Sequence, residues 1–195
     1  MINPKEERTF IMVKPDGVKK GLIGEIIKRL EQRDLKIVAL EMFQPTREQL
    51  DNHYPKNREW IARLGTKTKT TYEKYGYSAK EEIGTEDEFE IGQKVRKWLL
   101  DYMTLAPLVR MIIQGIHAVD TVRKIAGVTQ PYLAEMGTIR GDFSIDSPIL
   151  ANKEKRATMN LMHASETPEE AKHEIEHWFG KNPPIFDYKR FGVDN

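Results

Sequence analysis

One histidine, His163, stands where a short apolar run meets the start of a helix. The helix start is well marked: Thr167 is a suitable N-cap, Pro168 fits the first helical position, and Glu170 is placed for a capping box. A neutral imidazole at such a position can attack phosphorus through one nitrogen while a partner orients the other. A lone histidine is also a common structural residue, so the residues around it must distinguish the two interpretations.

Cationic and hydrogen-bonding side chains recur at predicted strand ends, in the long loop before His163 and on a helix beside that loop. Taken singly, each is more often a structural or surface residue. Taken together they suit a polyphosphate, which guanidinium forks, an ammonium group and hydroxyls would bind. The set comprises Lys14, Arg123 and Arg140, with Thr129, Asn160 and Tyr54 as neutral donors. The glycine patterns of Walker-type and dinucleotide-binding loops do not occur in the sequence.

A second histidine pattern points to different chemistry. His173, Glu174 and His177 match the H-E-x-x-H helix of zinc proteases. A catalytic zinc needs three protein ligands, and the extended form of the motif would place its third ligand at Pro183. The carboxylates left in the tail are those of Asp187 and Asp194. Zinc hydrolysis is therefore a remote alternative, and charge on a helix surface is the simpler explanation.

Composition excludes several classes of protein. The 195 residues are 39% hydrophobic and 31% charged, with a formal net charge of +1 and no cysteine. These values suit one globular domain, residues 1–195, with no disulfide framework and no general attraction to nucleic acid. The start of the chain is too polar for a signal peptide, and no apolar run has the length of a membrane span. We expect a cytoplasmic protein.

Hydrophobic periodicity predicts alternating strands and helices. Strands are expected at residues 8–14, 35–43, 107–113 and around His163, and helices at 21–33, 46–54, 91–102, 119–126 and 168–179. Residues 55–88 show the weakest pattern and are interpreted as a solvated insertion with an amphipathic helix. Residues 127–152 are interpreted as a long loop. The order predicts an α+β fold: a ferredoxin-like βαββαβ four-stranded antiparallel sheet with covering helices and a helical insertion.

Three stretches of the sequence resemble the signature segments of nucleoside diphosphate kinases. They are residues 8–18 (RTFIMVKPDGV), 137–143 (GTIRGDF) and 160–165 (NLMHAS). The similarity continues in the same order through residues 53–54, 107–115, 122–123, 129–131, 174–179 and 187–189. It covers most of the chain, and the motifs are highly specific in combination.

This resemblance implies reversible ping-pong transfer of the terminal phosphate from a nucleoside triphosphate to a nucleoside diphosphate, with little selection of the base. His163 matches the histidine that becomes phosphorylated, Glu174 the carboxylate that orients it, and Ser165 the adjacent serine. Lys14 belongs to both the catalytic and the binding residues. Residues that match those contacting phosphates, ribose or the transferred group are Lys14, Tyr54, Arg123, Thr129, Arg140 and Asn160. Magnesium would arrive on the nucleotide phosphates, with no protein ligand assigned to a metal.

The chain also departs from the pattern of this family. Insertions are expected at about 65–97 and 145–156, and the usual Gly-Ser-Asp after the histidine is Ala-Ser-Glu. The aromatic that stacks on the base is Trp60, with Leu64 nearby, or the alignment places Val95 and Arg96 there instead. The resemblance implies a homo-oligomer, a hexamer or a tetramer built from dimers. A non-catalytic module that binds nucleotide or single-stranded nucleic acid is the alternative, but no obligate nucleic acid is expected.

Overall fold

A computed structural model describes residues 6–189, so the first residues of the chain and Asp194 lie outside the described part. Four strands form one antiparallel sheet in the order β2-β3-β1-β4. Their bounds are β1 Glu7–Val13, β2 Lys36–Phe43, β3 Leu108–Gly115 and β4 Met162–Ala164. The ferredoxin-like α+β fold predicted from the sequence is confirmed. The central pair, β1 and β3, carries the core, and β4 delivers His163 opposite Met12.

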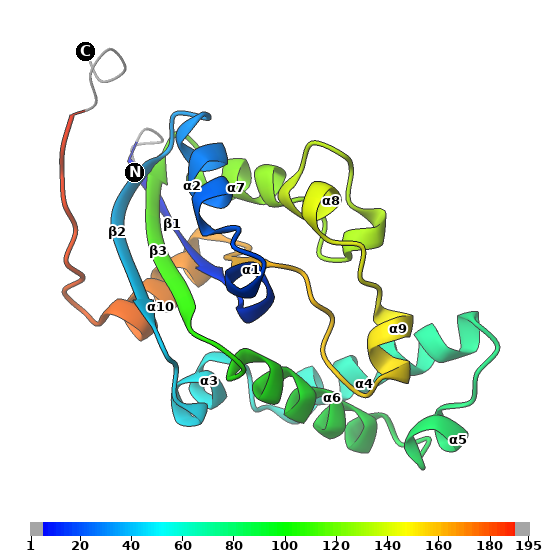
Figure 1. Ribbon diagram of the computed structural model, residues 1–195. Coiled ribbons are helices and arrows are strands. Elements are labelled where there is room, and N and C mark those ends of the chain that lie inside the picture. Colours follow the sequence, from blue (N-terminus) through cyan, green and yellow to red (C-terminus); the bar gives the residue numbers. More distant parts are fainter. Residues whose placement is uncertain (1–5, 190–195) are drawn as a thin grey trace.

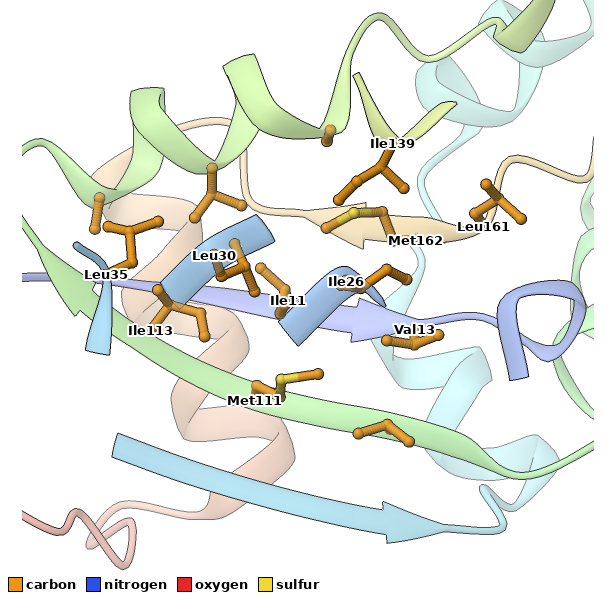
Figure 2. Close-up of a cluster of buried hydrophobic side chains, with 14 residues drawn as sticks. Ile11, Val13, Ile26, Leu30, Leu35, Met111, Ile113, Ile139, Leu161 and Met162 are labelled. Carbon is orange, nitrogen blue, oxygen red and sulfur yellow. The ribbon is translucent and has the colours of Figure 1, made fainter. Parts of the chain in front are cut away.

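The two faces of β1 bury different sets of side chains, as expected from the alternation of a strand. Ile11 and Val13 face helices α2 (Ile23–Glu31) and α7 (Ala118–Ala126), and Figure 2 shows them beside Ile26 and Leu30 of α2. Phe10 and Met12 point the other way, towards α10 (Pro168–Phe179). Helices thus cover both faces of the sheet, as Figure 1 shows.

The segment expected to be least regular, residues 55–88, is largely helical. Helix α4 spans Arg58–Lys74, α5 spans Ala79–Ile83, and α6 (Glu88–Met103) runs back along α4. The prediction of one amphipathic helix in a solvated insertion therefore underestimated the helical content of this segment. The buried positions of α4 are Ile61, Gly65, Thr68 and Tyr72. A glycine and a threonine on the buried face weaken the apolar signal, although their spacing is helical.

Shorter helices also replace expected turns and loops. Residues 15–19, for which no element was predicted, form α1 (Pro15–Lys19), whereas α3 (Arg47–His53) lies within the helix expected at 46–54. The predicted loop 127–152 contains a 3₁₀ turn, Pro131–Leu133, and helices α8 (Ile139–Phe143) and α9 (Pro148–Lys153). Thr138 and Ser147 cap α8 and α9 through their side chains. Helices this short carry no full apolar face, so periodicity does not reveal them.

The C-terminal segment lies along the outer edge of the sheet. The backbone N–H of Phe186 donates to the carbonyl of Val38 at 2.9 Å, and Lys36 donates to the carbonyl of Tyr188 at 2.7 Å. Figure 1 shows this segment (red) beside β2.

In residues 6–189, no helix is both long and apolar enough to cross a bilayer.

Helices α4 and α6 approach each other at two glycines. A Cβ atom added at Gly92 would lie 1.9 Å from the carbonyl oxygen of Ile61, and one at Gly65 would lie 1.7 Å from that of Glu88. We predict that Gly92→Ala lowers the free energy of unfolding by about 1–3 kcal/mol, because the helices must separate. Denaturant unfolding measures the change. Gly24→Ala in α2 is the control: its Cβ meets nothing within 4 Å, so we expect roughly 0.5–1 kcal/mol of stabilisation. Equal effects of the two substitutions would contradict this packing.

Candidate active site

A cavity of about 270 Å³ opens at the ends of β1 and β4, beside α7 and α8. His163 lies in its wall together with all three cationic residues singled out from the sequence. The predicted site residues that line the cavity are Lys14, Arg123, Thr129, Arg140, Asn160 and His163. The fold therefore brings together residues that are almost 150 positions apart in the chain, between Lys14 and His163.

The imidazole of His163 is held by a buried carboxylate. Its Nε2 lies 2.8 Å and 2.9 Å from the two carboxylate oxygens of Glu174, and the Ser165 hydroxyl donates to Oε2 of that carboxylate at 2.6 Å. Burial alone would raise the pKa of Glu174. The hydrogen bond and the charge of His163 lower this pKa by more, so the net shift is downward. An ionised Glu174 accepts from Nε2–H. The lone pair of a neutral ring is then on Nδ1, which makes no hydrogen bond within residues 6–189.

Lys14 is a buried cation that borders the cavity. Its Nζ donates to Oδ1 of Asn160 at 2.7 Å, and the amide nitrogen of Asn160 donates to the carbonyl of Thr129 at 3.0 Å. Burial, reinforced by the charge of Arg140, lowers the pKa of Lys14 to about 8. The ammonium group is thus poorly compensated by the protein, and an anion in the cavity would stabilise it.

Arg140 holds the wall of the cavity together. Its guanidinium donates to the carbonyls of Asn160 (3.1 Å), Gly127 (2.5 Å) and Met162 (2.7 Å). Burial and the nearby Arg123 lower the pKa of Arg140 to about 10. These carbonyls use part of its five N–H groups, so the residue combines a structural role with a fixed positive charge.

Arg123 and Thr129 occupy the exposed side of the cavity. The Arg123 side chain is 44% exposed and lies 4.0 Å from a carboxylate oxygen of Glu166. Such a contact in solvent contributes little stability and leaves the guanidinium able to change partner. Glu166 stands where the resemblance predicted aspartate, so this departure places a longer carboxylate beside the cavity.

A strained turn sets the approach to β4. Leu161 has φ of +69°, which is unfavourable for a residue with a side chain. Its N–H donates to Asp16 (3.0 Å), and its carbonyl accepts from the N–H of Lys14 (2.8 Å). Tyr102 donates to the other oxygen of Asp16 at 2.5 Å. A Cβ at Gly17 would lie 2.7 Å from the Leu161 carbonyl, so glycine is needed there. Asp16 and Tyr102 were not among the site residues predicted from the sequence.

His53 is a further residue that the sequence analysis did not single out. It ends α3, and its ring lies edge-on to His163 with centroids 5.3 Å apart. The indole N–H of Trp178 donates to Nδ1 of His53 at 3.2 Å. Burial, together with the charge of His163, lowers the pKa of His53 to about 3, so this ring is neutral at physiological pH. In the sequence, residues 53–54 belonged to the resemblance, but no role was assigned to the histidine.

Tyr54, which was expected to contact phosphates, ribose or the transferred group, does not line the cavity, and neither do the candidates for base contact. Tyr54 and Trp60 stack with ring centroids 6.4 Å apart, and Leu64 lies one turn further along α4. The alternative residues are engaged elsewhere: Val95 packs in the cluster around Tyr72, and Arg96 forms an ion pair with Asp51. Burial, with the charge of Glu174, raises the pKa of Tyr54, so its hydroxyl remains protonated.

The zinc-protease pattern does not form a metal site on α10. Glu174 turns inward to His163, whereas His173 is exposed and His177 lies 3.1 Å from the carbonyl of Gln49. Within residues 6–189, no third histidine or carboxylate completes a ligand set with these two histidines. The remote alternative of zinc hydrolysis therefore has no support in this helix.

Comparison with known proteins agrees with this geometry. The family model for nucleoside diphosphate kinase matches residues 7–62 and 88–183. The chain belongs to the nucleoside diphosphate kinase family. The unmatched residues 63–87 comprise most of α4, all of α5 and the turn before α6. Membership of this kinase family establishes the chain as an enzyme of nucleotide phosphotransfer.

Known nucleoside diphosphate kinases align with this chain over most of their own length. A nucleoside diphosphate kinase from Pyrobaculum aerophilum is 46% identical over 89% of this chain and 94% of its own length. One from Archaeoglobus fulgidus is 39% identical over 89% of this chain and 86% of its own length. The crystal structure of an NDP kinase from P. aerophilum superposes with a TM-score of 0.89 at 43% identity, covering 93% of this chain and all of the other.

A further solved structure relates to the chemistry. It is a transition-state mimic of the Borrelia burgdorferi nucleoside-diphosphate kinase with bound vanadate and ADP. It superposes with a TM-score of 0.75 at 31% identity and covers 97% of this chain and 95% of the other. The fold of this kinase is thus shared with a protein in which nucleotide and a phosphate analogue are bound together.

The bond between His163 and Glu174 leads to a kinetic prediction. We expect Glu174→Gln to lower turnover by about 100-fold with little change in nucleotide binding, because the amide keeps the shape but not the charge that orients and stabilises the imidazole. Steady-state kinetics together with equilibrium nucleotide binding test this. Parallel losses in turnover and in binding would contradict a role through His163.

The depressed pKa of Lys14 leads to a prediction on pH. The group is cationic below about pH 8 and loses its charge above it, so kcat/KM should fall as pH rises through about 8. A pH profile from about pH 6 to about pH 10 measures this alkaline limb. Lys14→Gln is the matched variant, with lower kcat/KM and no such limb. An identical limb in the variant would assign the titration to another group.

Proposed function

We propose that this kinase works by a ping-pong reaction in which His163 carries the phosphate. The observation that carries this proposal is the placement of His163: its Nε2 is bound by Glu174, and its ring lies in the wall of a cavity with three cationic side chains. Nδ1 attacks the terminal phosphorus, and the bond from that phosphorus to the bridging oxygen breaks. The nucleoside diphosphate leaves with this oxygen, and a second diphosphate then takes the phosphate from Nδ1.

The charges around the ring suit both half-reactions. When Nδ1 bonds to phosphorus, the ring keeps its proton on Nε2 and becomes positive, and the ionised Glu174 stabilises that charge at 2.8 Å. Lys14, Arg123 and Arg140 offset the negative charge of the phosphates. Thr129 and Asn160 supply neutral donors. Ser165, which is buried and bonded to Glu174, acts in this proposal by positioning that carboxylate.

Magnesium enters this proposal as part of the substrate. The cavity contains three cations among its lining residues, which suits phosphate oxygens and does not suit a site for a free metal ion. Mg²⁺ therefore arrives on the nucleotide phosphates and supplies further charge neutralisation there. The protein's own contribution is the placement of Lys14, Arg123 and Arg140.

The nucleotide base would be bound by stacking on an aromatic side chain. Trp60, with Leu64 beside it, offers an aromatic face to a base, and stacking selects weakly among bases.

Leu40 and Met42 on the edge strand β2 are 50% and 53% exposed, which favours association of copies into a hexamer or tetramer. In this proposal the protein is cytoplasmic and forms one domain with insertions at about 65–97 and 145–156. The unmatched residues 63–87 overlap the first of these.

The intermediate gives the deciding experiment. Brief exposure of the protein to Mg·ATP should add one phosphate, visible in the intact mass, because Nδ1 is free to attack. The adduct should be labile in acid and stable in alkali, as expected of phosphohistidine. His163→Ala should abolish it.

The matched control is His173→Ala, which removes an exposed histidine from the helix that carries Glu174. This variant should form the adduct like the parent. A protein that binds nucleotide without any adduct, or an adduct that survives in His163→Ala, would overturn the proposed mechanism. Binding without turnover would instead support the non-catalytic alternative.

A further inference from the structure

Behind the cavity, three potential metal ligands converge from three different elements. His53 ends α3, His163 lies in β4, and Glu174 lies in α10. One ligand atom from each lies within 4.8 Å of the others. The nearest pairs are His163 Nε2 with Glu174 Oε1 at 2.8 Å, and His53 Nδ1 with Glu174 Oε1 at 3.7 Å. The reaction described above uses His163 and Glu174 but gives no role to His53.

We infer that this cluster is an inhibitory site for a divalent transition metal such as zinc. Two histidines and one glutamate are a ligand set that zinc accepts while leaving a fourth position open. Zinc–ligand bonds of about 2.0–2.2 Å place tetrahedral ligand atoms roughly 3.3 Å apart. Three ligands make three pairs. The 2.8 Å pair must open and the 3.7 Å pair must close, each by about half an ångström, and the two histidine nitrogens, which lie within 4.8 Å of each other, must come to the same spacing.

His53 is suited to complete such a site. The Trp178 indole N–H can only donate, so Nδ1 of His53 carries a lone pair, which is what a metal binds. The lone pair of Nδ1 accepts a hydrogen bond from the Trp178 indole, which the metal must displace. A hydrogen bond between neutral groups contributes only about 1 kcal/mol, so this competition weakens binding without preventing it.

Metal binding at this site would block the reaction through the tautomer of His163. Zinc takes the lone pair at Nε2, and the proton that Nε2 carried moves through solvent to Nδ1. A neutral ring bound through Nε2 carries its proton on Nδ1, which then has no lone pair for phosphorus. No oxidation is involved. This step rests on the proposed function, since it inhibits only if Nδ1 is the nucleophile.

The site differs from the H-E-x-x-H pattern of the sequence. That pattern would use His173 and His177 on α10, whereas the cluster uses His53 from α3 and excludes the exposed His173. His53 and His173 therefore separate the two sites experimentally. Glu174 belongs to both sets and cannot distinguish them.

Equilibrium dialysis of nucleotide-free protein against zinc, with the metal counted per chain, tests binding directly. We expect one zinc per chain in the parent and at least about tenfold weaker binding in His53→Asn, whose amide oxygen can still accept from Trp178. His53→Gln is a second variant, and circular dichroism checks that both fold. His173→Gln, the control, should bind like the parent. No retained zinc, parent-like binding in both His53 variants, or weakened binding in His173→Gln would overturn the site.

Inhibition is then tested on zinc-loaded protein freed of excess metal. Brief exposure to Mg·ATP should yield at least about tenfold less phosphoenzyme than metal-free protein, with the loss relieved in His53→Asn. Normal phosphoenzyme in a protein that holds one zinc would overturn the inhibitory role. If metal-free parent forms no phosphoenzyme, the proposed mechanism fails instead, and the zinc count still decides the site.

Discussion

The hydrogen bond between His163 and Glu174 is the contact on which the rest of the site depends. A buried carboxylate must be paired, and removing its partner would leave an uncompensated charge in the interior. Ser165 and His163 satisfy Glu174 together, so α10 is tied to β4 at one point. The antiparallel pairing of β4 with β1 sets the position of His163 opposite Met12. Sheet register and helix docking thus fix the same imidazole from two sides.

The positive charges of the cavity are assembled by folding, before any substrate is present. Arg140 is held by three carbonyls, and Lys14 is held by Asn160, although burial disfavours both cations. Their mutual repulsion is an unfavourable term that a bound polyanion removes. Donors fixed in this way need little reorganisation when charge moves during transfer. The strained backbone of Leu161, held by Asp16, belongs to the same fixed framework.

The sequence predicted the parts of the structure that depend on local pattern. The nearly unbroken apolar run of β1, the capping at Thr167 and the cations near the strand ends could all be read directly from the sequence. The roles of His53 and Tyr102 were not, because each depends on a partner far along the chain: Glu174 for the first and Asp16 for the second. The helical content of residues 55–88 was underestimated for a similar reason, since the buried face of α4 includes a glycine that fits only against α6.

The C-terminal segment covers part of the outer edge of the sheet. It bonds to the outer edge of β2 near Val38, where backbone groups would otherwise be open to another strand. Uncovered strand edges are templates for intermolecular β-pairing and for amyloid-like growth. Trimming of the chain past Phe186 would remove this hydrogen bond and leave the lining of the cavity unchanged, so the expected cost is a carbonyl at the edge of β2 that another strand can bind.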